Sequence, residues 1–201
     1  MIEEVESVKA RSIVLSGVIL AGLADTLGGG MEARQRTGFM KRVRVYDGWS
    51  VVNDNVMGGV SQSRAELTDR ETLRFTGTVS LENNGGFASI RHDSHAFEIG
   101  SGSGIRIVVR GDGRTYQLRV RASDGYYGIA HKADFLTVEG EWQELRIPWD
   151  RFSATYRGQA VPGAPELKGE DVFEVGFLIA DGQAGPFNLE IAAIEAFEMD
   201  P

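Results

Sequence analysis

The chain has 201 residues, of which 42% are apolar and 25% are charged, so it is long enough for one well-packed domain and too apolar to be disordered throughout. It contains no cysteine, which excludes disulfides, thiolate metal sites, iron–sulfur clusters and a cysteine nucleophile. The formal charge of −8 argues against a nucleic-acid-binding protein, which needs a basic surface.

Residues 1–40 are predicted to be a leader that is separate from the rest of the chain. Within it, residues 13–24 form an apolar run that is too short to span a bilayer but has the length of a signal-peptide core. Acidic residues outweigh basic ones before this run, whereas a signal peptide starts with positive charge. Two interpretations therefore stay open: export with cleavage before Asp25, or a short surface helix or flexible leader on a cytoplasmic or membrane-peripheral protein.

Residues 41–199 are predicted to form an all-β domain. From Val43 onward no long stretch keeps a helical period, whereas short segments that alternate polar and apolar residues recur between glycine-containing turns. The segment 153–171 contains two prolines and is expected to be one long connection without a strand. This pattern favours a β-sandwich or jelly roll. The expected strands are 61–67, 73–81, 87–91, 105–110, 115–122, 127–132, 142–147, 172–179 and 187–198.

Aromatic residues within these segments are expected to be mostly buried, because large rings dominate protein cores. The rings expected in the core are Trp49, Phe75, Phe87, Phe135, Trp142, Phe177 and Phe187.

Sequence motifs for catalysis and cofactor binding do not stand out. The segment 100–104 is rich in glycine but lacks the spacing and the following helix of a dinucleotide-binding loop. His92, Asp93 and His95 lie close together, yet no further ligand has a suitable spacing, so a solvated turn is favoured over a metal site. We therefore expect no catalytic residue, no metal and no cofactor.

Two segments repeat an unusual combination of Asn, Gly and large side chains. They are 49–61, WSVVNDNVMGGVS, and 81–87, LENNGGF. In a structural interpretation, the Asn and Asp side chains close turns, and Gly58, Gly59, Gly85 and Gly86 allow tight reversals, some of them at positive φ. In a functional interpretation, the two loops present polar side chains to a partner or ligand.

The candidate binding residues come from these two loops and from two arginines. They are Asn53, Asp54, Asn55, Met57, Asn83, Asn84, Arg91 and Arg157. Arg157 is expected either to meet an acidic group of a partner or to pair with Asp54.

The pattern W-x-x-x-N-D-x-V-M-G-G-x-S at residues 49–61 resembles the signature of the complex I intermediate-associated protein family, the assembly factors of NADH:ubiquinone oxidoreductase. The motifs L-E-N-N-G-G-F-A-S at 81–89, I-P-W at 147–149 and G-P-F at 185–187 follow in the order expected for that family. Together these motifs cover roughly residues 45–198.

This resemblance implies a galactose-binding-like jelly roll that acts as a non-catalytic, chaperone-like assembly protein. Its partner would be a protein such as a subunit of a respiratory complex, and the family has no established catalytic residues to transfer. Because neither a long mitochondrial presequence nor a fused nucleotide-binding domain is evident, the resemblance points to a bacterial stand-alone member.

A carbohydrate- or small-ligand-binding module of the same fold is the alternative. Its sugar platforms would be exposed aromatic rings, unless these rings pack in the core. An enzyme that uses Asp54, Arg91 or His92 is the least favoured hypothesis. The candidate platforms are Tyr126, Tyr127, Trp149 and Tyr156.

Overall fold

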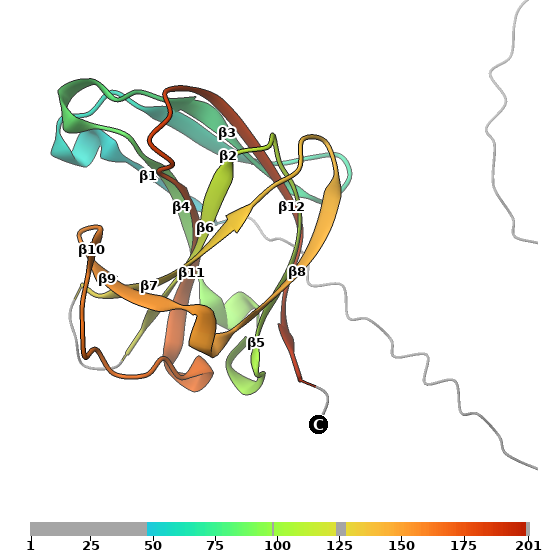
Figure 1. Ribbon diagram of the computed structural model, residues 1–201. Helices are drawn as coiled ribbons and strands as arrows, with labels where there is room; N and C mark the ends of the chain where they lie inside the picture. The colour runs from blue at the N-terminus through green and yellow to red at the C-terminus, as the bar shows by residue number, and fades with distance from the viewer. Residues whose placement is uncertain (1–47, 98, 124–127, 200–201) are drawn as a thin grey trace, which may run out of the picture. The chain divides into compact units, whose positions relative to one another are not determined.

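The computed structural model describes residues 48–97, 99–123 and 128–199, which form a sandwich of two antiparallel β-sheets (Figure 1). One sheet has seven strands in the order β1 (Ser50–Asn53), β4 (Ala88–Asp93), β11 (Val172–Ile179), β6 (Thr115–Ala122), β7 (Ala130–Leu136), β9 (Ser153–Tyr156) and β10 (Gln159–Ala160). The other has five strands in the order β2 (Gln62–Leu67), β3 (Leu73–Val79), β12 (Gly185–Phe197), β5 (Gly104–Arg110) and β8 (Trp142–Pro148).

Short 3₁₀ turns connect several of these strands. They are η1 (Asp54–Met57), η2 (Glu82–Asn84), η3 (Ser94–Ala96), η4 (Ile99–Ser101), η5 (Trp149–Arg151) and η6 (Gly169–Asp171). Among the residues that the structure describes, no helix has both the length and the apolar character needed to cross a membrane. The predicted leader at residues 1–40 lies outside the described residues, so the proposed domain boundary stays a prediction.

The period of two in the sequence separates the core from the outer face of each sheet. In β6, Tyr116, Leu118 and Val120 point between the sheets and are buried, whereas the residues that alternate with them are partly exposed. From the opposite sheet, Phe75 and Phe187 meet edge to face with ring centroids 4.8 Å apart. These contacts place the core between the two layers and leave the outer face of each sheet available for other roles.

Most of the predicted strands are confirmed, but three strands of the larger sheet were not expected. β9 and β10 lie in the segment that was predicted to be a connection, and that prediction is wrong over residues 153–160. β9 pairs with β7 over only three positions, so it is too short to show a clear alternation of polar and apolar residues. β1 coincides with the start of the first Asn–Gly segment, and β7 begins at Ala130, later than predicted.

The expected aromatic core is confirmed at Phe75, Phe135, Phe177 and Phe187, all of which are buried, while Trp49 and Phe87 are partly buried. The prediction for Trp142 is wrong, because 44% of this residue is exposed. In β8 the alternation places Trp142 on the outer face, and the guanidinium of Arg110 lies 5.0 Å from its ring centroid.

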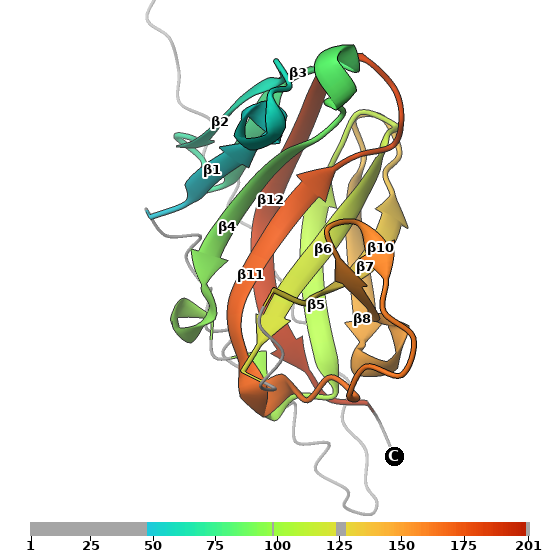
Figure 2. The same ribbon diagram turned by 90° about the vertical axis from the view of Figure 1, so that its left-hand side faces the viewer.

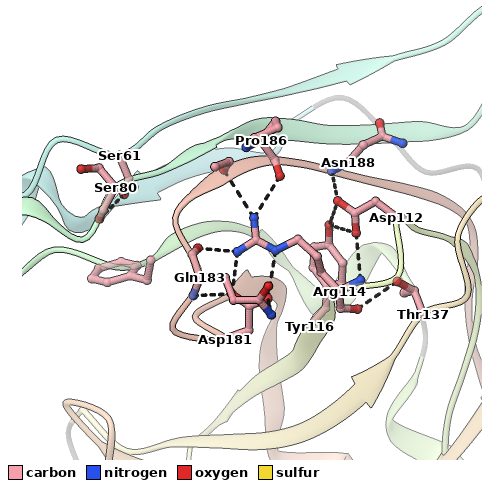
Figure 3. Close-up of polar contacts among 12 residues, drawn as sticks. Ser61, Ser80, Asp112, Arg114, Tyr116, Thr137, Asp181, Gln183, Pro186 and Asn188 are labelled. Atoms are coloured by element: carbon pink, nitrogen blue, oxygen red, sulfur yellow. Dashed lines mark hydrogen bonds and ion pairs between the residues drawn. The ribbon is translucent and has the colours of Figure 1, made fainter.

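A partly buried arginine connects the ends of the two sheets (Figure 3). Arg114, just before β6, forms two hydrogen bonds of 2.9 and 2.6 Å with the carboxylate of Asp181. It also donates to the carbonyl oxygens of Gln183 at 2.6 Å and of Pro186, in β12, at 2.9 Å. These bonds connect the larger sheet to β12 of the smaller one and hold the loop between β11 and β12.

The neighbouring side chains extend this connection (Figure 3). The buried Tyr116 hydroxyl donates to Asp112, whose carboxylate also accepts the backbone N–H of Asn188 at 2.7 Å. Burial and the Asp112 carboxylate both raise the pKa of Tyr116, so the phenol stays neutral and acts as a donor. These bonds therefore anchor this end of the seven-stranded sheet to β12 of the smaller sheet.

Candidate functional site

Asp54 joins the two Asn–Gly segments at the first position of η1. Its side chain is fully buried and accepts hydrogen bonds from the Ser61 backbone N–H at 2.9 Å and from the Ser61 hydroxyl at 2.5 Å. It also accepts the N–H of Gly86 at 2.7 Å and, more weakly, that of Phe87 at 3.3 Å. Ser61 Oγ in turn accepts the N–H of Ser80 at 2.9 Å (Figure 3). One carboxylate therefore organises both loops.

The charge of Asp54 is stabilised by these donors. Burial by itself disfavours ionisation, but the hydrogen bonds from Ser61, Gly86 and Phe87 outweigh it and lower the pKa of the carboxyl group. Asp54 is thus ionised at neutral pH, and its negative charge is satisfied by backbone N–H groups and a hydroxyl rather than by a basic side chain. The expected alternative, an ion pair between Arg157 and Asp54, is not formed.

Two glycines leave the space that Asp54 needs. A Cβ on Gly59 would lie 2.4 Å from Cγ of Asp54, and one on Gly85 would lie 2.6 Å from Oδ2. The other two glycines, Gly58 and Gly86, have φ angles of +94° and +126°, which confirms that some of the four take positive φ.

The asparagines of the two segments divide between scaffold and surface. Asn53 is buried, and its Oδ1 accepts the Ser63 hydroxyl at 2.6 Å. Asn83 and Asn84 are exposed and occupy left-handed backbone with φ of 55° and 58°, while Asn55 is exposed in η1. Asn53 and Asp54 are therefore inaccessible to a partner in this conformation and belong to the scaffold. A binding role for the three exposed asparagines stays a prediction.

The outer face of the seven-stranded sheet carries a groove of about 810 Å³. Figure 2 looks onto this sheet, with β1 at one margin and β10 at the other. The lining comes from β1, η1, β4, β11, β6, β7 and β9, from the turn between β9 and β10, and from a few residues just outside these strands. Among the residues expected to bind a partner, Met57, Arg91 and Arg157 line this groove.

Strand pairing places basic side chains across the floor of the groove. Gly176 in β11 lies opposite Arg91 in β4 and opposite Arg119 in β6. Arg119 in turn lies opposite Lys132 in β7. Gly176 contributes no side chain between the two arginines, and a Cβ there would lie 2.4 Å from the carbonyl oxygen of Ile90 in β4. We call the basic residues Arg91, Arg119, Arg121, Lys132 and Arg157 the basic cluster.

Only part of this positive charge is neutralised within the protein. Arg121 pairs with Glu174 at 3.2 Å, and Lys132 pairs with Asp134 at 2.9 Å. Among the described residues, no carboxylate forms an ion pair with the other three members of the basic cluster. Burial, followed by the neighbouring guanidinium groups of Arg121 and Arg91, lowers the pKa of Arg119. The groove thus concentrates positive charge on an acidic protein.

The margin of the groove near β1 is apolar. Val52, Val56 and Met57 line it, and Leu178 on β11 adds a further apolar side chain to the groove. In η1, Val56 is 69% exposed and Met57 is 63% exposed, which is unusual for two adjacent large apolar residues. Their η1 turn is held by the bonds to Asp54, so the signature loop presents an apolar rim beside the basic cluster.

Sequence reasoning missed Arg119, Arg121 and Lys132. The alternation in β6 shows that Arg119 and Arg121 share the wet face, and this was the available signal. What it does not show is that β11 lies between β4 and β6 and brings Arg91 to the same face.

The candidate sugar platforms do not form a common surface in the described part of the chain. Trp149 is partly buried, and its Nε1–H donates to the carbonyl of Gly102 at 2.7 Å. Tyr156 is exposed, with the guanidinium of Arg157 5.4 Å from its ring centroid. Tyr126 and Tyr127 lie outside the described residues.

The turn that follows β4 was considered as a metal site. Within the described ranges, no group of three or more His, Asp or Glu residues is arranged to hold a metal ion. The His92 ring packs 5.3 Å from Trp49 and 5.2 Å from Phe97, measured between ring centroids. His92 therefore forms part of an aromatic cluster at the margin of the core.

A solved structure shares this architecture. The family 11 carbohydrate-binding module of a cellulosomal cellulase of Clostridium thermocellum superimposes with a TM-score of 0.55 and 13% identity. The match covers 80% of this chain and 96% of that module. Identity this low shows a common fold alone, and it confirms the predicted jelly-roll sandwich.

Two curated relatives match most of this chain in sequence. The mitochondrial Complex I intermediate-associated protein 30 of Mus musculus is 27% identical over 172 residues, which cover 75% of this chain and 52% of the relative. A probable Complex I intermediate-associated protein 30 of Caenorhabditis elegans is 28% identical over 158 residues, which cover 69% of this chain and 46% of the relative. The chain thus spans about half the length of these two relatives. The sequence profile of the Complex I intermediate-associated protein 30 (CIA30) family matches residues 32–191. The chain belongs to the Complex I intermediate-associated protein 30 family.

Proposed function

We propose that this protein is a non-catalytic assembly module that holds a protein partner in the groove of its seven-stranded sheet. Membership of the family and the names of the mouse and nematode relatives support an assembly role. The observation that carries the proposal is the exposed apolar rim of Val56 and Met57, which the buried Asp54 holds at the margin of the groove. Adjacent exposed apolar side chains beside a groove are typical of protein-binding surfaces.

The chemistry of the groove favours binding over catalysis. General acid–base catalysis needs a carboxyl or imidazole group that is able to exchange protons with a substrate. The carboxylate in the described lining, Glu174, is held by Arg121. Asp54, which was considered for an enzyme, is buried and engaged by Ser61 and Gly86. A rigid scaffold that presents apolar and charged side chains in one groove suits the recognition of a partner.

The proposed function is tested by complementation in the native host. Deleting the gene is expected to reduce fully assembled complex I and to increase its partial assemblies, as seen on native gels. Wild-type protein should restore assembly, whereas Met57→Asp should not, because it places a charge on the apolar rim. Met57 is largely exposed, so this change is expected to leave folding intact.

Leu136→Asp provides the matched control. Leu136 is exposed to the same extent as Met57, at 63%, but it does not line the groove. We expect it to restore assembly like the wild type. If the deletion leaves complex I unchanged, or if both variants restore assembly fully, the proposed function is refuted.

A further inference from the structure

Resting on this proposed function, we infer that the segment of the partner bound in the groove is an extended acidic peptide. Its carboxylates are held by Arg91 and Arg119, on either side of Gly176, and by Arg157 in the turn between β9 and β10. The apolar rim of the signature loop would receive an apolar side chain of the same segment. The inference thus names the chemistry of the partner, which neither the family nor its relatives specify.

The geometry of the floor provides the first argument. Arg91 and Arg119 are on strands separated by β11, so their backbones lie about 10 Å apart, which is two strand spacings. Gly176 occupies the position between them and contributes no side chain. Two long guanidinium side chains can therefore converge on a carboxylate above Gly176, or hold two carboxylates of one extended segment, which lie about 7 Å apart at alternate positions.

The balance of charge provides the second argument. Arg91, Arg119 and Arg157 form no ion pair with any carboxylate of the described residues, although the chain as a whole carries a formal charge of −8. Arg119 has a single described hydrogen bond, from Nη2 to the Thr155 hydroxyl at a long 3.4 Å. Burial and the neighbouring Arg121 and Arg91 disfavour the charge of Arg119, and Glu174 and Asp134 offset this only in part. An anionic ligand would relieve the remaining cost.

The mixture of side chains favours a peptide over other polyanions. Val52, Val56 and Met57 lie at one margin of the same groove and Leu178 lies on β11 within it, so a ligand must match apolar and cationic surface within a short distance. A peptide provides both kinds of side chain along one backbone, whereas the charged groups of nucleic acids and acidic polysaccharides are not interspersed with apolar side chains. The overall negative charge of the chain would also repel a long polyanion outside the groove.

Binding is measured by fluorescence anisotropy with the full chain. The probe is a short labelled peptide with Glu at every second position and Leu and Ser between, and a matched peptide carries Gln in place of Glu. We expect the Glu peptide to bind and the Gln peptide to bind at least about tenfold more weakly, since charge-assisted hydrogen bonds are lost. Added salt should weaken the binding of the Glu peptide, because salt screens charge pairs.

Variants locate the binding to the basic cluster. Arg91→Met and Arg119→Met are each expected to weaken binding of the Glu peptide about tenfold or more, since each removes a cation but keeps most of the apolar stem. Arg64→Met is the control, because Arg64 is exposed on β2 in the other sheet. This variant should bind the Glu peptide with the same affinity as the wild type. Arg119→Met should also keep or raise the melting temperature, whereas the loss of a purely structural arginine would lower it.

The outcomes separate this inference from the proposed function. Weak binding of the Glu peptide, equal binding of the Gln peptide, or unchanged affinity in both arginine variants overturns the inference, even if Met57→Asp fails in the host. Stronger binding of oligogalacturonate than of the Glu peptide also overturns it, in favour of an acidic glycan. If the Glu peptide binds as expected but the deletion leaves complex I intact, the assembly role fails while the recognition of acidic segments stands.

Discussion

Replacing Asp54 by Ala is expected to lower the free energy of unfolding by about 3–5 kcal/mol. The buried carboxylate accepts the backbone N–H groups of Ser61 and Gly86 at 2.9 and 2.7 Å, and the Ser61 hydroxyl at 2.5 Å. Each backbone donor left without a partner costs about 1–3 kcal/mol, and the lost hydroxyl bond adds about 1 kcal/mol. Water that enters the emptied site reduces the upper end of this range, because both loops lie near the surface.

The measurement is urea unfolding followed by tryptophan fluorescence, with Asp150→Ala as the control. Asp150 is exposed in η5, so its replacement should change stability by less than about 0.5 kcal/mol. A loss below about 1 kcal/mol for Asp54→Ala would refute the view that this carboxylate holds the two loops together.

Acidification tests the same assignment independently. The pKa of Asp54 is lowered in the folded protein, so the carboxylate stabilises the fold above its ordinary pKa of 3.8 and loses this contribution as the pH falls through the folded pKa. The stability difference between wild type and Asp54→Asn should therefore be constant near neutral pH and shrink below about pH 4. A difference that stays constant into this acidic range would contradict the assignment.

Three further predictions concern the scaffold and are checked by the same unfolding measurement. Arg114→Ala should destabilise by about 3–5 kcal/mol, since it leaves the nearly buried Asp181 carboxylate without its ion-pair partner, and a loss near zero would show that the network in Figure 3 is dispensable. Phe75→Ala should cost about 3–5 kcal/mol, whereas the exposed Trp142→Ala should cost about 1 kcal/mol or less, and equal losses would contradict the corrected position of Trp142. Gly59→Ala should cost about 1–3 kcal/mol by forcing a methyl group against Asp54, and a stable variant would show that the loop adjusts freely.

The class of the fold was predictable from the sequence because periodicity is a local property. The alternation in residues 118–121 and the apolar run in residues 172–179 correspond to β6 and β11. β9 and β10 escaped prediction because short strands that pair over two or three positions carry no distinct period. The error at Trp142 was avoidable, since the same alternation places it on the face of Glu144 and Arg146, away from the core.

The candidate site was only partly predictable, because it depends on the order of strands in space. The two Asn–Gly segments were expected to share a role, and the structure joins them through Asp54. The sequence does not reveal that Asp54 is buried and connects the two segments, or that Met57 is exposed. The juxtaposition of Arg91 and Arg119 depends on β11 lying between β4 and β6, which a single sequence does not specify.

The central claim, that the groove holds a protein partner, is tested most directly by photocrosslinking in the native host. A photoreactive amino acid is placed in the full chain at Met57, on the rim of the groove, or at the equally exposed Leu136 outside it. After irradiation, mass spectrometry identifies the attached segment. We predict one protein adduct from position 57 that includes an acidic stretch, and no such adduct from position 136. The absence of a protein adduct at position 57, or the same adducts from both positions, would contradict the claim.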